Sequence, residues 1–533
     1  MISKYESKFM LPLPCIAGLI GCILFMLCSL STFAVTYYVN GTSGNDQHKG
    51  NSPSTAFRSL IKINSLQLKA GDSLLFRCGT AYNGQFKVSG MGVPGHPLVI
   101  SSYGKGVKPV INGQGNFAAA VLVYNSAYIM IENLEITNKG TSIAAGRMGL
   151  HILLDNFGIA KETVLRNLYI HDVNGSNVKK DGGGAGIHWT NQGKATLSAF
   201  DGLLIEHCLL ERTDRNGITS SGYWSRQNWF PSYHVVIRNN RLNDIGGDGI
   251  VPIGCDGAVI EHNIVVKAGQ RFAEGDAAAG IWPWSSDHTV IQYNEVSDTA
   301  GPWDGQGFDA DWNCRNTIIQ YNYSHHNEGG FLLICDDGGV TGPSSIGNQG
   351  TVIRYNISIN DGFRTSGRSA GFSPVIHITG PVKNTKIYNN LIYIPARNTS
   401  GLDSTLIEMG NWKGYADSTL VANNIFYIAG RSGHHLTKST RNNFQSNVYA
   451  GSKNNKGLPG EAMYMEPDFI RLPSKEPQGF GALKDFMLQL NSVLAEAGLP
   501  VTTASITDFF GNTVQQGIKP TIGIHQLTHT TKK

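Results

Sequence analysis

The chain has 533 residues, of which 41% are hydrophobic and only 15% are charged, so it can bury a large core. Its formal net charge is +4 and is not gathered in a basic block, which argues against nucleic acid as a partner. Glycine is abundant, at 64 residues, without a collagen period or a low-complexity tract. Most of these glycines should therefore serve tight turns.

Residues 1–34 have the pattern of an export signal. Two lysines precede an apolar run over residues 11–30, and a small-residue cleavage site ends at Ala34. We therefore expect a secreted or periplasmic protein. The run is also long enough to span a bilayer, and Cys22 lies in a sequence like a bacterial lipoprotein box. An uncleaved anchor, or association with the outer membrane, stays open as the alternative.

Cysteine usage excludes a fold held together by disulfides. An odd number of cysteines remains after the leader, so at least one is unpaired. We expect these side chains to act as small fillers of a core. They are Cys78, Cys208, Cys255, Cys314 and Cys335.

The strongest signal is a short repeat in which an isoleucine is followed, three positions later, by an asparagine. Successive strong copies lie 23 to 34 residues apart, which indicates a constant structural rung joined by loops of variable length. The asparagines of the strong copies are Asn240, Asn263, Asn294, Asn322, Asn356 and Asn390, and weaker copies end at Asn133, Asn167, Asn424 and Asn447.

A second motif, glycine followed by a large apolar residue, precedes each copy, as in Gly249-Ile250 and Gly280-Ile281. Each unit thus contains two short strands separated by turns, and it cannot bury its apolar face alone. We predict an all-β, single-stranded, right-handed parallel β-helix. Stacked asparagines should form a hydrogen-bonded ladder at the spacing of about 4.8 Å between strands, and should adopt the left-handed backbone of the turn.

The two ends of the chain lack the repeat. We expect an N-terminal cap and first coils over residues 35–115, with a short helix at Phe57–Leu66, followed by the β-helix over residues 116–465. Residues 466–533 should form an extension that packs on the last coils, and Leu483–Ala497 looks helical. The whole mature chain should be one domain.

With these features the chain resembles the secreted bacterial right-handed β-helix repeat proteins of carbohydrate-degrading systems, which have the pectin-lyase-like fold. The resemblance rests on Tyr37-Tyr38-Val39 with Gly44-Asn45-Asp46, on the asparagine rungs, and on Asp508-Phe-Phe-Gly511. It implies a carbohydrate-active enzyme that acts on a polysaccharide or oligosaccharide. Polygalacturonase-like motifs, an adjacent aspartate pair and Gly-His-Gly, are not in the expected places, so the reaction stays open.

Tryptophan is concentrated in one part of the repeat. A solenoid needs no local excess of tryptophan, whereas aromatic faces stack well on sugar rings. The alternative is packing beneath long loops. Seven of the eight tryptophans lie between residues 189 and 312: Trp189, Trp224, Trp229, Trp282, Trp284, Trp303 and Trp312.

Carboxylates gather in the same stretch. Strand alternation after each glycine–apolar motif places Asp309 and Asp311 together on the outer face, about 7 Å apart and facing solvent, beside Trp282 and Trp284 one rung away. Asp248 lies two rungs away, about 10 Å along the axis. A pair of carboxyl groups separated by 6.5–9.5 Å is typical of inverting glycosidases, so Asp248 with Asp309 or Asp311 favours inversion; a pair on adjacent rungs, such as Asp311 with Asp336, would suit retention. Asp248 beside glycine has the alternative role of a turn cap.

Further residues of the same coils are candidates for substrate binding. Arg271 stands among them either to bind an acidic sugar or to pair with Glu274. The same alternation breaks down after Phe331, where the next outward residue would be apolar, so either the register slips there or that face is covered. The candidates are His188, Trp282, Trp284, Trp303, Arg271, Glu274, Asp276, Asp304 and Asp336.

We therefore predict a glycoside hydrolase that works by carboxylate acid/base catalysis, acts as a monomer and needs no cofactor or metal. A calcium site stays open, although residues 309–314 depart from a calcium loop at the position of Cys314. One alternative is a polysaccharide lyase, which would need a cationic residue at the site. None lies among the side chains that strand alternation places on the outer face near the tryptophans. The other alternative is a carbohydrate-binding protein without catalysis.

Overall fold

The computed structural model describes residues 34–272, 276–340, 342–394, 403, 405–428, 433–451, 459–473 and 475–527. The predicted export signal lies almost entirely outside these residues. Within the described ranges, no helix has the length and apolar character needed to cross a membrane.

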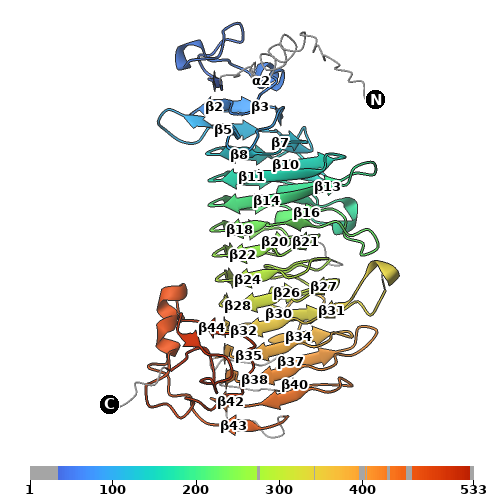
Figure 1. The fold of residues 1–533 in the computed structure, drawn as a ribbon, viewed down its shortest axis with the longest axis vertical. Coiled ribbons are helices and arrows are strands. Elements are labelled where there is room, and N and C mark those ends of the chain that lie inside the picture. Colours follow the sequence, from blue (N-terminus) through green and yellow to red (C-terminus); the bar gives the residue numbers. More distant parts are fainter. Residues whose placement is uncertain are drawn as a thin grey trace, which may run out of the picture.

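The chain winds into an elongated parallel β-helix, with the N-terminal coils at one end and the C-terminal coils at the other (Figure 1). Each complete coil adds a strand to each of three faces, and the strands pair with those of the coils before and after. This confirms the predicted fold class.

The longest face is a parallel sheet that runs the full length of the stack. Its strands are short because each begins and ends at a turn of the coil. They are β1 (Thr36–Val39), β2 (Ser73–Arg77), β5 (Leu98–Tyr103), β8 (Ile129–Glu132), β11 (Ile159–Arg166), β14 (Ala199–Glu206), β18 (Val236–Arg238), β22 (Val259–Glu261), β24 (Val290–Gln292), β28 (Ile318–Gln320), β32 (Val352–Arg354), β35 (Lys386–Tyr388), β38 (Leu420–Ala422) and β41 (Asn443–Gln445), with β17 (Ser232–Tyr233) and β21 (Cys255–Asp256) attached.

The second face is also continuous and follows the asparagine turns. Its strands are β3 (Ala81–Asn83), β6 (Val110–Asn112), β9 (Glu135–Asn138), β12 (Tyr169–Val173), β15 (Leu209–Thr213), β19 (Arg241–Ile245), β23 (Ile264–Val266), β25 (Glu295–Ser297), β29 (Tyr323–His325), β33 (Ile357–Ile359), β36 (Leu391–Ile394), β39 (Ile425–Ile428), β42 (Asn447–Ala450) and β43 (Ala462–Tyr464).

The third face is divided into two sheets. The N-terminal one contains β4 (Phe86–Val88), β7 (Ala119–Tyr124), β10 (Arg147–Asp155), β13 (Gly184–Gln192), β16 (Asn216–Ser221) and β20 (Ile250–Val251). The C-terminal one contains β26 (Gln306–Ala310), β30 (Gly330–Cys335), β34 (Ile376–Thr379), β37 (Thr405–Gly410) and β40 (Gly433–His435). Two short pairs lie apart: β27 (Cys314–Arg315) with β31 (Asn348–Gln349), and β44 (Ile506–Thr507) with β45 (Thr513–Val514).

The described helices are short. They are α2 (Leu60–Asn64) and the 3-10 helices η1 (Pro53–Thr55), η2 (Lys179–Asp181), η3 (Gly342–Ser344) and η4 (Phe480–Phe486). Helix α2 lies within the predicted cap helix but is shorter; it begins after Ser59, whose side chain accepts a hydrogen bond from the Lys62 backbone N–H, and it buries Leu60 and Ile63.

The prediction of a helix at Leu483–Ala497 is wrong. Only η4 is helical in this region, and Leu488 instead forms an antiparallel bridge with Phe469. The apolar residues that suggested a helix are separate anchors: Leu483, Leu488 and Leu494 are buried one after another against the sheet formed by the second face. The tail does pack on the last coils, as predicted, and lies beside the C-terminal part of the stack in Figure 1.

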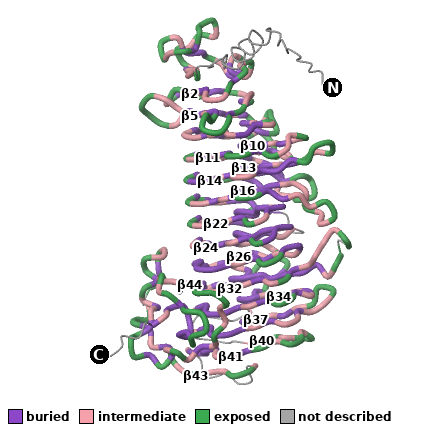
Figure 2. Tube along the Cα trace, in the orientation of Figure 1, coloured by how far each residue is buried: buried purple, intermediate pink, exposed green. Residues whose placement is uncertain are grey.

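The core is one continuous column of inward-facing side chains along the stack, seen as buried segments in Figure 2. The asparagine ladder runs beside it, because each side-chain amide donates to the side-chain oxygen of the next asparagine. The Asn263 amide donates to Asn294 and the Asn294 amide to Asn322, each at 3.0 Å, and all three residues are fully buried. The ladder prediction is confirmed.

One detail of the ladder prediction is wrong. The left-handed backbone does not fall on the ladder asparagines but on the residue before each one, such as His262 with φ 55° and Tyr293 with φ 55°. Asn133 and Asn167 occupy this preceding position, where φ is also positive, and Leu134 and Leu168 fill the ladder position in these early coils. The ladder depends on the asparagine side chain. The buried asparagine itself therefore needs no left-handed backbone and keeps a negative φ.

Each of the five described cysteines is free, as expected. Cys208 and Cys255 belong to the core column. Cys335 differs from the prediction, because its thiol donates to Asp311 Oδ1 at 2.7 Å on the outer face of its strand.

Candidate active site

The third face is interrupted where the tryptophans and aspartates gather. Strand β20 ends the N-terminal sheet and β26 begins the C-terminal one. The coil between them, Ile281-Trp282-Pro283-Trp284, makes only single bridges to its neighbours, at Ile281 and Trp284. Pro283 has no backbone N–H to donate to a neighbouring strand, so this coil cannot form a regular ladder.

The predicted column of outward-facing side chains that contains Trp282 and Asp309 is correct through this gap. The bridges from Ile250 to Ile281 and from Ile281 to Phe308 place Trp282 beside Asp309. The predicted register is off by one residue at the next coil, because Phe308 pairs with Leu332 and not with Phe331. Gln306 pairs with Gly330 as well, so the two strands stay in step and the glycine–apolar motif Gly330-Phe331 stands one position earlier in its strand. The column of outward-facing side chains that contains Trp282 and Asp309 therefore continues through Leu333, His377 and Glu408.

A cavity of about 640 Å³, called here the main cavity, lies on this face. It collects carboxylates, cations and tryptophans from several coils, which is the composition of a sugar-binding cleft. Its polar and aromatic lining residues include Lys179, Asp248, Trp282, Trp303, Asp304, Gln306, Asp309, Asp311, Trp312, Arg364, His377, Glu408 and Trp412.

Three of the carboxyl groups that line this cavity are poorly solvated. Burial raises the pKa of Asp304 to about 6 and that of Asp311 to about 7. The pKa of Asp309 is raised further above its usual range by burial and by the charges of Asp304 and Asp311. Carboxyl groups with pKa values near neutrality can both hold and release a proton under ordinary conditions.

The three groups differ in access. Asp309 points outward from its strand, as predicted, but it does not face solvent: only 4% of the residue is exposed, and its Oδ1 is buried without a hydrogen-bond partner among the described residues. Asp311 is half-buried, and its Oδ1 accepts from the Trp312 backbone N–H at 2.8 Å and from the Cys335 thiol. Asp304 is half-buried and has φ 52°, a strained conformation for a residue other than glycine.

Asp248 lies in the cavity wall, fixed from all sides. Its Oδ2 is 3.1 Å from Arg215 Nη1, and its Oδ1 accepts from the Ala279 backbone N–H and the Trp282 indole N–H, each at 3.0 Å. Arg215 has no exposed surface. These contacts give Asp248 a fixed orientation and occupy both of its oxygens, which suits the positioning of Trp282 better than proton transfer.

Cationic side chains reach the main cavity from loops that the strand columns do not include. Lys179 Nζ, from η2, is 3.9 Å from Asp248 Oδ2 and 5.1 Å from the centre of the Trp282 ring. Arg364 is buried, and its Nε and Nη2 have no hydrogen-bond partner among the described residues. The site therefore contains cationic side chains, although none of them lies on a strand that lines it.

A second cavity of about 340 Å³, called here the side cavity, joins the main cavity toward the N-terminal coils. The predicted candidates His188, Trp282 and Trp284 all line it. Trp303 lines the main cavity and is 45% exposed. Trp189 is fully buried in the core. The concentration of tryptophans therefore comes partly from core packing and partly from the lining of the cavities.

Three other candidates hold loops and do not line either cavity. Arg271 donates to Asp214 Oδ1 at 2.9 Å and also to Asp244, while Glu274 lies outside the described residues. Asp276 Oδ2 accepts from the Lys179 backbone N–H at 2.7 Å and so fixes η2. Asp336 accepts from two backbone N–H groups, of Gly338 and Asn348.

Sequence reasoning did not identify Arg364, His377, Glu408 and Trp412 as lining residues. His377 and Glu408 follow Asp309 in the corrected outward column, so recognition of the one-residue offset at Gly330 would have found them. Burial lowers the pKa of His377 to about 4, so this imidazole is neutral at ordinary pH. Arg364 gives no signal in the sequence, because its loop enters the cavity only through the tertiary fold.

Within the described part of the chain, no group of three or more His, Cys, Asp or Glu side chains has the arrangement of a metal site. The expectation of metal independence stays a prediction, and so does the calcium alternative.

Comparison with known proteins agrees with this architecture. The family described as "Right handed beta helix region" matches residues 111–288. A curated lacto-N-biosidase of Bifidobacterium longum subsp. longum is 29% identical over 565 aligned residues, covering 88% of this chain and 32% of the relative. The chain thus spans about a third of the length of that relative.

Among solved structures, the native GH136 lacto-N-biosidase from Eubacterium ramulus superimposes with a TM-score of 0.58 at 25% identity, covering 75% of this chain and 68% of that one. Its selenomethionine derivative gives a TM-score of 0.56 at the same identity, over 76% and 68% of the two chains. The chain is a right-handed parallel β-helix protein similar to carbohydrate-active enzymes of this architecture.

Proposed function

We propose that this chain is a glycoside hydrolase that cleaves a neutral oligosaccharide or polysaccharide in the main cavity. The observation that carries the proposal is the set of three carboxyl groups, Asp304, Asp309 and Asp311, whose pKa values are raised within a cavity lined by tryptophans. Hydrolysis of a glycosidic bond needs two carboxyl groups, one to protonate the leaving oxygen and one to act as base or nucleophile.

Asp304 and Asp311 are the best pair because substrate can reach both, whereas Asp309 is almost fully covered. We assign the base or nucleophile to Asp311 from its geometry, since the Trp312 amide and the Cys335 thiol both donate to its Oδ1 and hold it in one orientation, although its pKa of about 7 lies above the value of about 6 for Asp304. We assign the proton donor to Asp304. The buried Asp309 between them would hold a proton and donate a hydrogen bond to substrate.

This assignment differs from the pair considered in the sequence. Inversion was expected from Asp248 acting across two coils, but both Asp248 oxygens are engaged by Arg215, Ala279 and Trp282. Whether the anomeric configuration is inverted or retained now depends on the separation of the Asp304 and Asp311 carboxyl groups around bound substrate. Inverting enzymes hold about 6.5–9.5 Å and retaining enzymes about 5 Å, and proton NMR of the first-formed anomer distinguishes the two.

A neutral substrate is favoured by the charges in the main cavity. Its lining holds five carboxyl groups (Asp248, Asp304, Asp309, Asp311 and Glu408) against two cations, Lys179 and Arg364. Even with Asp304 and Asp309 holding protons, the remaining three carboxyl groups outnumber the two cations, so the lining offers no excess of positive charge to an acidic sugar. The similarity to lacto-N-biosidases supports the same class and suggests lacto-N-biose glycosides as the first substrates to test.

The test is hydrolysis of the p-nitrophenyl glycoside of lacto-N-biose, within a wider panel of neutral aryl glycosides. Asp304→Asn and Asp311→Asn should each lower kcat about 10²–10⁴-fold while the circular dichroism spectrum stays unchanged. Asp417→Asn, at an exposed ion pair with Arg441, is the matched control and should retain full activity. Full activity of either active-site variant would refute the pair.

The roles within the pair need a second measurement. Asp304→Asn should recover activity on a 2,4-dinitrophenyl glycoside, because this leaving group departs without a proton. Asp311→Asn should stay inactive on that substrate and recover only with added azide. The opposite pattern would exchange the two roles.

The lyase alternative retains one observation in its favour, the arrival of Lys179 and Arg364 from loops. A lyase leaves an unsaturated product that absorbs in the ultraviolet, so incubation with polyuronates separates the two functions. An ultraviolet-absorbing product without hydrolysis of neutral glycosides would replace the hydrolase proposal.

We also propose that the protein is exported and acts as a monomer. The leader of residues 1–34 supports export, and a solenoid with a tail on its C-terminal coils has no need of a partner to complete its core. Cell fractionation with N-terminal sequencing tests the first statement. Sedimentation analysis tests the second.

A further inference from the structure

The side cavity has a lining unlike that of a cavity left by packing alone. It lies beside the main cavity, with which it shares Asp248 and Asp311 among other lining residues, and it extends toward the N-terminal coils at β16. Its lining includes the polar side chains of His188, Asn216 and Thr219, together with three tryptophans, Trp282, Trp284 and Trp312, which are called here the aromatic wall. At about 340 Å³ it is large enough for a small ligand.

Two polar atoms in this lining are buried without a hydrogen-bond partner among the described residues. They are Asn216 Oδ1, an acceptor, and Trp284 Nε1, a donor. A buried polar group without a partner is unfavourable, so these two atoms are free to bind a ligand that reaches them. One acceptor and one donor match the hydroxyl groups of a sugar, which can serve as both.

The charge of this cavity favours a neutral ligand. Burial lowers the pKa of His188 to about 3, so its imidazole is uncharged, and its Nε2 is 3.0 Å from Ser221 Oγ. The only charged groups in the lining are those at the junction with the main cavity: Lys179, Asp248 and Asp311. Away from that junction the described lining is uncharged.

Trp284 of the aromatic wall is held in place by Trp224, which is not among the lining residues of the side cavity. The two rings stack with centres 5.4 Å apart, and Trp284 also contacts Trp312 in an edge-to-face arrangement with ring centres 5.0 Å apart. Trp224 belongs to the loop after β16, and Asn313 Nδ2 donates to its backbone oxygen at 3.1 Å. The orientation of Trp284 therefore depends on where this loop lies.

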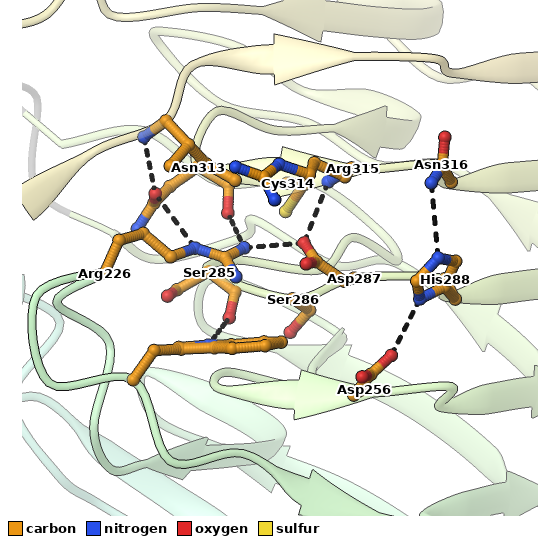
Figure 3. A network of polar contacts seen from close by, with 12 residues as sticks. Arg226, Asp256, Ser285, Ser286, Asp287, His288, Asn313, Cys314, Arg315 and Asn316 are labelled. Carbon is orange, nitrogen blue, oxygen red and sulfur yellow. Dashed lines mark hydrogen bonds and ion pairs between the residues drawn. The ribbon is translucent and has the colours of Figure 1, made fainter.

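Arg226 fixes that loop to two later coils, as Figure 3 shows. Its Nη2 donates to Asp287 Oδ1 at 2.8 Å and to the Asn313 backbone oxygen, and its guanidinium lies 4.1 Å from the centre of the Trp229 ring. Its side chain is only 7% exposed. A buried ion pair with several hydrogen bonds holds one geometry, which a Lys side chain could not reproduce.

We propose that the side cavity is a second sugar subsite, which binds a neutral monosaccharide unit next to the bond that is cleaved, and that Arg226 is a positioning residue for its aromatic wall. This proposal rests on the proposed hydrolase function. It extends that function by stating that a substrate with one further neutral sugar is bound by groups outside the main cavity.

The experiment compares two substrates. One is the p-nitrophenyl glycoside of lacto-N-biose, and the other is a neutral tetrasaccharide that contains the same disaccharide. Asn216→Ala and Arg226→Met should lower kcat/KM for the tetrasaccharide about tenfold, mainly through KM, and change that for the aryl glycoside less than twofold. Asn443→Ala and Arg441→Met, at exposed positions, are the matched controls and should change neither.

The outcomes separate the two proposals. If both variants lose activity equally on both substrates, or on neither, the subsite is refuted while the hydrolase stands. If the wild-type chain hydrolyses neither substrate, the hydrolase proposal fails, and the subsite is tested by quenching of tryptophan fluorescence with the same tetrasaccharide. Quenching that Asn216→Ala weakens about tenfold would support a binding site; equal or absent quenching would overturn it.

Discussion

Replacing Asp311 by asparagine should stabilise the protein while it abolishes activity. The pKa of Asp311 is about 7 in the folded protein and 3.8 in a reference carboxyl group. When a carboxyl group has a higher pKa in the folded state than in the unfolded state, raising the pH lowers the stability of the folded protein, because the unfolded chain loses that proton at a lower pH. One pKa unit is worth about 1.36 kcal/mol, so ionisation of Asp311 costs about 4 kcal/mol at pH 8 and about 2 kcal/mol at pH 5.

The Asp311→Asn variant has no such cost, and its side-chain oxygen can still accept from the Trp312 amide and the Cys335 thiol. With an unfolding entropy of about 2.1 cal/mol/K per residue over 533 residues, Tm should rise by about 4 °C at pH 8 and about 2 °C at pH 5. Differential scanning calorimetry at the two pH values measures this.

The control is Asp417→Asn, because the Arg441 guanidinium holds the pKa of Asp417 below its usual range. Loss of that carboxylate should not raise Tm at either pH. An Asp311→Asn variant that is no more stable than wild type at pH 8, or equally stabilised at both pH values, would show that burial does not disfavour the Asp311 carboxylate.

Three further predictions follow from the same structure. The pair titrates with pKa values of about 6 and about 7, so kcat/KM should be greatest between pH 6 and 7 and fall on both sides; a flat profile from pH 4 to 9 would contradict this. Asn294→Ala in the ladder should cost at least about 3 kcal/mol in urea unfolding, because it leaves the Asn263 N–H buried without its acceptor and removes the Asn294 hydrogen bonds to Ile260 and Asn322, whereas the exposed Asn443→Ala should cost under about 0.5 kcal/mol. Dialysis against EDTA should leave hydrolysis of the aryl glycoside unchanged; a loss that added calcium restores would establish a calcium site.

The fold could be predicted because it repeats. A single isoleucine–asparagine unit carries little information, but its recurrence from Asn240 to Asn447 requires stacked coils with the asparagines in register. Strand alternation then placed Trp282 beside Asp309 correctly across the gap in the third face. The same logic failed at Gly330, because the glycine–apolar motif stands one position earlier in that strand, and an offset of one residue assigns every side chain to the opposite face.

The sequence by itself determined the parallel β-helix, its asparagine ladder and the stretch of chain in which tryptophans and carboxylates gather. Only the tertiary structure decided which of these groups share a cavity. Arg364 and Lys179 come from loops whose path no periodicity describes, and Asp248 is engaged by Arg215 through a contact that only folding creates. The raised pKa values of Asp304 and Asp311 likewise arise from burial by distant coils, since the cost of desolvating a charge depends on everything that surrounds it and not on its neighbours in the chain.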